Sequence, residues 1–338
     1  MRAMILAAGY GTRLWPLTAD RTKPAIPFLG RPLVGYVAEY LAGFGIREII
    51  VNLHHRPGSV REALGDGSRF GVSLSYVDEP VILGTSGALD NARDLLQDET
   101  FVVVNGKIVT DIDLSLAIET HRNKKALATL VLRKNSARER YSLVNTKDGL
   151  VTGFGGMPQA VASDPQLDVD LRTRSSSQEV PLMFTGIQIL DPRVFDYIPK
   201  GVFSHSTTDV YPQAIANGEP IAAQVAEGEW HELSTIQRYL ETSVAMLTRE
   251  GRSVDIGTDC SISDHADVSE SVIWDRVTIE SGARVQRAVL GDGVCIRAGE
   301  TIESAAVVRK ALVDGADAPS KALPGRMSGD NFVVSLSQ

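Results

Sequence analysis

The chain has 338 residues, enough for two or three domains, and 43% of them are hydrophobic, so it can bury a large core. Its formal net charge of −8 excludes a global basic field that would recruit nucleic acid or an anionic membrane. The cysteines, Cys260 and Cys295, lack CxxC spacing and neighbouring histidines, which argues against a zinc site or disulfide framework. That cysteine usage is typical of a reducing cytoplasm. Because no apolar run approaches the roughly 18 residues of a membrane span, we also expect no membrane partner.

Residues 1–245 alternate short β-rich runs with longer amphipathic runs. Strand–helix–strand alternation predicts a mostly parallel sheet with helices on both faces, and hence an α/β domain. The predicted strands are Ala3–Ala8, Ile49–Leu53, Leu74–Val77, Phe101–Val104 and Leu127–Leu132. The predicted helices are Leu33–Phe44, Ser86–Leu96 and Leu114–Arg122.

From Ser142 the pattern changes to hairpin-like pieces, which commonly form a lid or a substrate-side lobe attached to the main sheet. These pieces are Ser142–Asn145, Leu150–Phe154, Phe184–Leu190 and Ile221–Val225. The segment Ala162–Val180 is rich in Ser, Asp and Gln, which predicts a mobile loop.

Residues 253–315 are periodic, with apolar residues recurring every 17 positions. The three registers are Ile256, Ile273, Leu290 and Val307; Ile262, Ile279, Ile296 and Val313; and Val268, Val285 and Ile302. Registers about six residues apart are typical of hexapeptide β-helix repeats, whose stacked coils share one core. An irregular all-β domain would need all of these matches to be chance. We therefore expect a β-helix over 253–315, a tail over 316–338, and a homo-oligomer formed through the flat faces of the solenoid.

A glycine-rich turn follows the first predicted strand. It runs through Leu6, Ala7, Ala8, Gly9, Gly11 and Thr12 to Arg13, and Lys23-Pro24 follows. Glycines let backbone amides approach phosphate oxygens without interference from Cβ, and Arg13 and Lys23 add positive charge. The pattern is neither GxGxxG nor GxxxxGK[ST], so dinucleotide-binding and P-loop interpretations lack their motif. A tight turn with solvated cations would explain a bare GxG, but not Thr-Arg-Leu and Lys-Pro at this spacing.

At these residues the chain resembles the sugar-1-phosphate nucleotidyltransferases, whose signature is LAAGxGTRLxPLT followed by a Lys-Pro pair. Four further elements resemble this family: Glu79 with Gly84–Ala88, a nucleobase and ribose contact; Asn105-Gly106, which leads to a metal site; Thr185-Gly186, a sugar contact; and Glu232, in a stretch like GYWxDIGT. The GTSGAL version at residues 84–89 is most similar to the mannose-1-phosphate guanylyltransferase branch. The resemblance implies a Rossmann-like, mixed and mostly parallel sheet followed by a left-handed β-helix.

The implied reaction is nucleotidyl transfer from a nucleoside triphosphate, GTP favoured, to the 1-phosphate of mannose or another hexose or heptose. The protein must align two anions and neutralise developing charge. We expect Arg13 to contact the β- and γ-phosphates, and Lys23 the α-phosphate and the sugar phosphate. The implied nucleotide contacts are Leu6, Ala7, Ala8, Gly9, Gly11, Thr12, Arg13, Glu79, Gly84, Thr85, Asn105 and Gly106. The implied sugar-phosphate contacts are Lys107, Thr185, Gly186 and Glu232.

Three positions depart from the family pattern. In the family, an Asp after Asn-Gly and an Asp in WxDIGT hold Mg²⁺; here these positions are Lys107 and Glu232. The family's Glu-Lys-Pro aligns with residues 156–158, Gly-Met-Pro. A cation repels a metal ion, which leaves three alternatives open. The Lys107 ammonium partly replaces the metal's charge; Asp111 or Asp113 binds Mg²⁺ with Glu232; or catalysis is lost and the chain is a sugar-nucleotide-binding regulatory or scaffold subunit.

Two histidines bear on lesser alternatives. Hexapeptide helices often host acyl transfer, which generally uses a histidine between coils, and only His265 lies in this region. His231 stands beside Glu232 and is a further candidate for a ligand contact, although packing is the default role of an isolated histidine.

Overall fold

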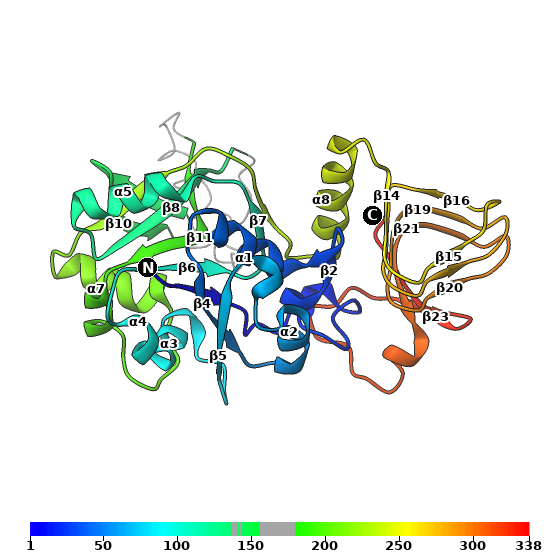
Figure 1. The fold of residues 1–338 in the computed structure, drawn as a ribbon, viewed down its shortest axis with the longest axis horizontal. Helices are drawn as coiled ribbons and strands as arrows, with labels where there is room; N and C mark the ends of the chain where they lie inside the picture. The colour runs from blue at the N-terminus through cyan, green and yellow to red at the C-terminus, as the bar shows by residue number, and fades with distance from the viewer. Residues whose placement is uncertain (137–140, 142, 156–179, 338) are drawn as a thin grey trace, which may run out of the picture.

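The computed structural model describes residues 1–136, 141, 143–155 and 180–337. It forms an α/β domain and a β-helix, with helix α8 (Ile236–Arg249) between them (Figure 1). Residues 156–158, and all of the loop expected over 162–180 except its last residue, lie outside the described residues. No helix in the described part of the chain combines the length and hydrophobicity needed to cross a membrane.

Among the described residues, a nine-stranded mixed sheet forms the centre of the α/β domain. Its order is β5 (Ser73–Asp78), β4 (Glu48–Leu53), β1 (Ala3–Leu6), β6 (Phe101–Asn105), β11 (Leu182–Leu190), β8 (Ala128–Lys134), β12 (Ile221–Val225), β10 (Leu150–Gly155) and β9 (Leu143–Lys147). Strands β5, β4, β1 and β6 are parallel, as are β8 and β12, whereas β11 is antiparallel to both its neighbours. Strand β10 is also antiparallel to both its neighbours, β12 and β9. The mixed sheet of the predicted α/β domain is confirmed, with its parallel pairings in β5–β4–β1–β6 and β8–β12.

The pieces expected to form a lid or a substrate-side lobe attached to the main sheet are strands of that sheet itself. Strand β11 lies in the middle of the sheet, between β6 and β8, and β9, β10 and β12 complete the same sheet. Most side chains of β11 are buried, so the strand packs as a core element and not as part of a mobile cover.

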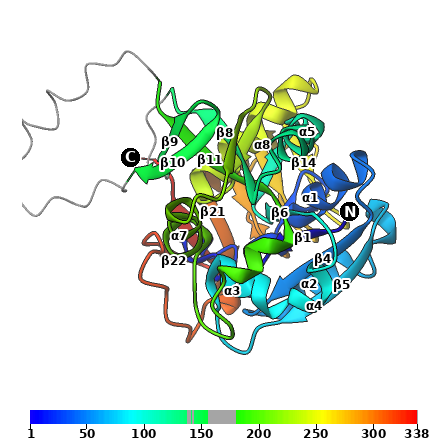
Figure 2. The ribbon, with the colours of Figure 1, turned by 90° about the vertical axis from the view of Figure 1, so that its left-hand side faces the viewer.

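Helices cover both faces of the sheet (Figure 2). Successive side chains of a strand point to opposite faces, so Ile5 packs with α1 (Leu33–Gly43), α2 (Pro57–Leu64) and α5 (Leu114–Lys124). The neighbouring Met4 packs with α3 (Gly84–Asn91), α4 (Arg93–Leu96) and α7 (Tyr211–Ala216). The one helix predicted over Ser86–Leu96 is therefore two helices. The remaining short elements of this domain are η1 (Thr12–Leu14), η2 (Lys23–Ala25), β2 (Pro27–Phe28), β3 (Arg31–Pro32), η3 (Ser68–Phe70), β7 (Ile108–Thr110), η4 (Pro192–Asp196), η5 (Ser206–Val210) and β13 (Trp230–Glu232).

The second body is a parallel β-helix with the predicted repeat. Its strands are β14 (Val254–Ile256), β15 (Ser261–Ile262), β16 (Asp267–Ser269), β17 (Ser271–Ile273), β18 (Thr278–Ile279), β19 (Arg284–Leu290), β20 (Cys295–Ile296) and β21 (Thr301–Arg309). Ile256 pairs with Ile273, Ile273 with Leu290, and Leu290 with Val307, as the period of 17 residues requires. The other two registers also stack, at Ile262–Ile279–Ile296 and Val268–Val285–Ile302.

The segment expected to be a tail is partly built into this β-helix. After η6 (Lys310–Leu312), strands β22 (Arg326–Ser328) and β23 (Asn331–Ser335) form a hairpin, and β23 pairs antiparallel with β21. Val334 is fully buried there. The hairpin covers apolar surface that the last coil would otherwise expose, so the β-helical body extends beyond residue 315.

One hydrophobic cluster contains residues of both the α/β domain and the β-helix. Leu14 and Trp15, from the segment after the glycine-rich turn, pack in the same cluster as Trp274 and Phe332 of the β-helix. The Trp15 and Phe332 rings are 5.3 Å apart. Tyr239 of α8 links the bodies further, since its hydroxyl donates to the Pro27 carbonyl at 2.6 Å and accepts from Trp274 Nε1 at 3.0 Å. The β-helix is therefore packed against the segment that carries the candidate phosphate-binding residues.

Candidate functional site

A first pocket of about 300 Å³ opens at the carboxyl ends of β1, β4 and β6, the edge of a parallel sheet where ligands bind. It is lined by Leu6, Ala7, Ala8, Gly9, Gly11, Lys23, Pro24, Asn52, Glu79, Ile82, Gly84, Thr85, Asn105, Gly106, Lys107 and His205. The structure thus brings together all the predicted nucleotide contacts except Thr12 and Arg13.

The glycine-rich turn has the close approach that its sequence indicates. Gly11 has φ 67°, a left-handed conformation, and a Cβ added there would lie 2.9 Å from the Cβ of Lys23. A side chain at position 11 would therefore be strained and would push Lys23 away. Gly11 places Lys23 against the turn that begins at the end of β1.

Buried Glu79 links two segments that line the first pocket by hydrogen bonds. Its Oε1 accepts from Asn52 Nδ2 at 2.6 Å and its Oε2 from the Leu83 amide at 3.1 Å. Asn52 Oδ1 in turn accepts from the Ala7 amide at 2.8 Å. Sequence reasoning missed Asn52, although a lone polar residue inside the apolar run of β4 was an available signal.

His205 is a second residue of this pocket that sequence reasoning missed. The Thr85 amide donates to His205 Nδ1 at 3.3 Å, and the Ser206 amide donates to Thr85 Oγ1 at 2.9 Å. The first amides of α3 are therefore occupied by the segment around residue 205. Nothing in the local sequence predicts this contact, because the partners are 120 positions apart.

Four charged side chains, Arg13, Lys23, Lys107 and Glu232, lie close enough to act on one another, and Lys23 and Lys107 line the first pocket. Lys107 forms an ion pair with Glu232, whose side chain is only 11% exposed. The antiparallel pairing of β7 with β13 sets this contact, since Ile108 lies opposite Glu232 and the Leu233 amide donates to the Lys107 carbonyl at 3.1 Å. Arg13 is exposed, and in the described part of the chain it has no ion-pair partner.

The charges perturb one another. Burial, together with the cations Lys107 and Arg13, lowers the pKa of Lys23 to about 7. Burial alone would raise the pKa of Glu232, but Lys107, Lys23 and Arg13 outweigh it and hold that pKa below its usual range. The cluster is an electropositive site with one ionised carboxylate, which is suited to phosphate.

The predicted Mg²⁺ ligands do not come together. Asp111 lies at the opposite end of the β7–β13 ladder from Glu232, where its carboxylate accepts from the Glu229 amide at 2.5 Å. Asp113 caps α5 by accepting from the Ser115 amide at 2.8 Å. Among the described residues, no group of three or more His, Cys, Asp or Glu side chains could hold a metal ion. The expected site at Asp111 and Glu232 is therefore not formed, and the residues present do not fit a divalent cation.

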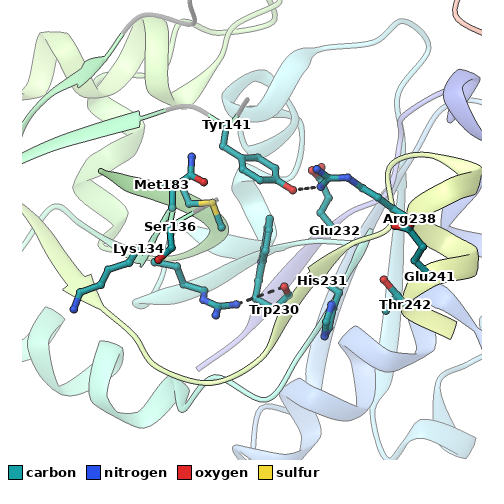
Figure 3. Close-up of a pocket in the computed structure, with 12 residues that line it drawn as sticks. Lys134, Ser136, Tyr141, Met183, Trp230, His231, Glu232, Arg238, Glu241 and Thr242 are labelled. Atoms are coloured by element: carbon teal, nitrogen blue, oxygen red, sulfur yellow. Dashed lines mark hydrogen bonds between the residues drawn. The ribbon is translucent and has the colours of Figure 1, made fainter. Parts of the chain in front are cut away.

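A second pocket, of about 450 Å³, lies on the other side of Glu232 (Figure 3). It is lined by Arg133, Lys134, Asn135, Ser136, Tyr141, Met183, Trp230, His231, Glu232, Arg238, Glu241 and Thr242. The Tyr141 ring meets Trp230 edge-on, with centroids 5.4 Å apart, and Arg238 donates to the Tyr141 hydroxyl. Because Lys107 lines the first pocket and Glu232 the second, their ion pair stands between the two.

Two of the predicted sugar-phosphate residues, Thr185 and Gly186, lie outside both pockets. The buried Thr185 hydroxyl donates to the Val131 carbonyl at 2.7 Å, and the Thr185 carbonyl accepts from Trp230 Nε1 at 2.9 Å. Gly186 lies against Asn105, where an added Cβ would come within 2.0 Å of the amide nitrogen. Neither residue lines the two pockets; Thr185 contacts Trp230, and Gly186 contacts Asn105.

The sheet, the glycine-rich turn and the cation cluster define a nucleotide-handling α/β protein, and comparison with known families identifies the class. Residues 2–249 match the nucleotidyl transferase family, and residues 243–315 match the family described as GlmU-like, C-terminal hexapeptide. The chain belongs to the nucleotidyl transferase family, and its second body is a left-handed β-helix of the hexapeptide kind.

Relatives in this family carry several substrate names. The chain is 32% identical to the UTP–glucose-1-phosphate uridylyltransferase of Synechocystis, over 83% of this chain and 72% of that protein. It is 27% identical to the mannose-1-phosphate guanylyltransferase of Mycobacterium tuberculosis, over 89% of this chain and 82% of that protein. A solved structure of a putative glucose-1-phosphate thymidylyltransferase from Bacillus anthracis is similar with a TM-score of 0.60 and 25% identity, over 73% of this chain and 94% of that one.

Proposed function

We propose that this protein transfers a nucleotidyl group from a nucleoside triphosphate, GTP ahead of ATP, to a sugar 1-phosphate. The observation that carries the proposal is the cation cluster between two pockets, where the phosphates of two substrates would meet. The sugar-phosphate oxygen forms a bond to the α-phosphorus as the bond to the β-phosphate breaks, and pyrophosphate leaves. Lys23 neutralises the α-phosphate and Arg13 the departing pyrophosphate.

The base and the sugar belong to different pockets in this proposal. The nucleotide lies in the first pocket, against Gly9–Gly11 and Gly84–Thr85, and the preference for GTP rests on the GTSGAL segment. The sugar, mannose or another hexose or heptose, lies in the second pocket, whose aromatic face is Trp230 with Tyr141. Relatives named for uridylyl and thymidylyl transfer make the base the first question to test.

A pyrophosphate-release assay across GTP, ATP, UTP and dTTP, each with mannose 1-phosphate and glucose 1-phosphate, tests the proposal, and calorimetry ranks the four nucleotides. We expect GTP to bind most tightly and to release pyrophosphate fastest with mannose 1-phosphate. Tightest binding of UTP or dTTP would reject the base assignment. Exchange of His265, which lies in an exposed turn of the β-helix outside both pockets, for Ala should leave release unchanged and serves as the control.

A second candidate, a sugar-nucleotide-binding subunit without catalysis, is favoured by one observation. Lys107 is paired with the Glu232 carboxylate, so this carboxylate is not available to act at the reacting phosphates. In that case calorimetry would show binding of nucleotide and sugar nucleotide, while no pair of substrates would release pyrophosphate.

A further inference from the structure

We propose that the Lys107–Glu232 ion pair stands in for a metal ion, so that this site binds a nucleoside triphosphate without a divalent cation. The inference rests on the proposed function only in placing a nucleotide in the first pocket. It concerns what neutralises the phosphates, and no metal takes part in the binding step.

The position of the pair is fixed by secondary structure on both sides. Lys107 stands at the turn between β6 and β7, and Glu232 is the last residue of β13. The β7–β13 ladder and the Leu233–Lys107 backbone bond hold the two side chains together before any ligand arrives. Lys107 remains 33% exposed and lines the first pocket, so its ammonium can also donate to a phosphate oxygen.

The charge of the site is the same with this pair as with a metal. Two carboxylates and a divalent cation sum to zero, and so do one ammonium and one carboxylate. With Arg13 and Lys23 protonated, either arrangement leaves two positive charges facing the phosphates. An ammonium binds phosphate as a point charge, so it can supply this charge without a metal's coordination geometry.

The surroundings also oppose a divalent cation. Mg²⁺ is usually held by one or two carboxylates together with substrate phosphates. Here Glu232 is bound to Lys107, and Lys23 and Arg13 act on the same carboxylate. Asp111 and Asp113 are hydrogen-bonded to other amides. A metal ion would have to break the pair and lie among three cationic side chains.

Calorimetry of GTP binding in EDTA and in millimolar-range Mg²⁺ tests the inference. We expect the wild-type affinity to change by less than about threefold between the two conditions. Lys107→Asp changes the local charge by two units and restores a second carboxylate beside Glu232. Its affinity should fall by about 100-fold in EDTA and recover in Mg²⁺, because the added carboxylate and Glu232 bind phosphate only through a metal. Lys200→Asp, the same substitution at an exposed position outside both pockets, should show no such metal dependence.

Binding of Mn²⁺ followed by electron paramagnetic resonance without nucleotide gives a second readout. Lys107→Asp should retain Mn²⁺ and the wild type should not. Lys107→Met, which removes the ammonium and adds no carboxylate, should bind GTP weakly in both conditions, and it covers the case in which Lys107→Asp fails to fold. The inference would be overturned if the wild type bound GTP only in the presence of Mg²⁺ and not in EDTA, or if the wild type retained Mn²⁺. Failure of the wild type to bind any nucleotide in either condition would instead overturn the proposed function, and the Mn²⁺ comparison would still decide the question of the pair.

Discussion

The surroundings of Lys23 disfavour its charged form in the free protein. Lys23 is partly buried, and Lys107 and Arg13 add repulsion, so its pKa falls to about 7 from the ordinary 10.5. A phosphate placed beside it would supply the missing negative charge. The uncompensated positive charge that lowers the pKa of Lys23 therefore strengthens binding of an anion.

Lys23→Met should stabilise the ligand-free protein by about 1 kcal/mol and abolish nucleotide binding, since it removes an unpaired cation. The gain depends on pH with a definite sign. Below pH 7 Lys23 is charged in both the folded and the unfolded wild type. As the pH rises from 7 toward 10.5, the folded state releases the Lys23 proton before the unfolded state does, so the wild type gains stability. Urea unfolding should therefore show a larger advantage of Lys23→Met at pH 6 than at pH 9. Lys134→Met, at an exposed position, is the control and should change stability by less than about 0.5 kcal/mol at either pH.

The sequence predicts the residues of this site that belong to a local motif and misses those that act across the fold. Lys107 directly follows Gly106, and Lys23 belongs to the Lys-Pro pair that follows the glycine-rich turn. Asn52 and His205 reach the same pocket from a strand end and a distant loop, with no spacing that a linear pattern could reveal. Thr185 fits the motif, yet its hydroxyl is bonded to the sheet, because side-chain direction is decided by packing.

The start of α3 depends on a close contact between two segments. Gly84 has φ 78°, and a Cβ added there would lie 2.4 Å from the Ser204 carbonyl oxygen. That same oxygen accepts from the Ser86 and Gly87 amides at 3.1 and 3.3 Å. The contact fixes one wall of the first pocket.

Gly84→Ala should destabilise the protein by about 1–3 kcal/mol and weaken GTP binding, because the side chain must displace a backbone carbonyl and adopt a left-handed conformation. Thermal unfolding and calorimetry measure the two effects. The matched control is Gly58→Ala in α2, where an added Cβ meets nothing within 4 Å, and it should stabilise by about 0.4–1 kcal/mol. A Gly84→Ala protein with wild-type stability and wild-type affinity for GTP would show that the contact between Gly84 and Ser204 does not constrain the first pocket.

Local patterns predict elements well and their order in the sheet poorly. Strands buried on both faces appear as continuous apolar runs, and the period of 17 residues gave the β-helix its register, so both were predictable. Strand β11 has the same local pattern whether it lies at an edge or in the centre. Its insertion between β6 and β8 depends on long-range pairing, so the local pattern indicates a strand but not its place in the centre of the sheet.

The shared core makes the β-helix part of the site's support and not an independent appendage. Removing residues 253–338 would uncover Leu14 and Trp15, which directly follow Arg13 and pack in the same cluster as residues of the β-helix. The homo-oligomer that we propose from the flat solenoid faces is therefore best tested by light scattering on the intact chain. The sequence indicated two domains and their boundary, but residues 14–28 appeared there only as a phosphate-binding loop.

One ion pair connects the β-helix directly to the loop that carries Lys23. Arg21 Nη2 lies 2.6 Å from Asp292 Oδ2, and the guanidinium stands over the Trp274 ring at 5.3 Å. Burial opposes the charge of Arg21, but Asp20 and Asp292 hold its pKa above the usual range. Asp292 Oδ1 also accepts from the Asp275 amide at 3.2 Å, so the pair is anchored in the β-helix backbone.

Asp292→Asn should lower stability by about 1–3 kcal/mol and weaken GTP binding by about 3- to 10-fold, because a mostly buried guanidinium loses a charged partner and the loop loses its anchor. Arg276→Gln is the matched control: Arg276 approaches the same carboxylate at 3.7 Å but is 60% exposed, so its loss should change stability by less than about 1 kcal/mol.

A double-mutant cycle with Arg21→Gln tests the pairing. The stability lost in the double variant should be smaller than the sum of the losses in the two single variants, as expected for residues that act as a pair. Calorimetry at a temperature where every variant is folded separates the two effects. If GTP affinity there is unchanged in Asp292→Asn, the pair stabilises the fold without positioning Lys23, and the β-helix does not support the site through this contact.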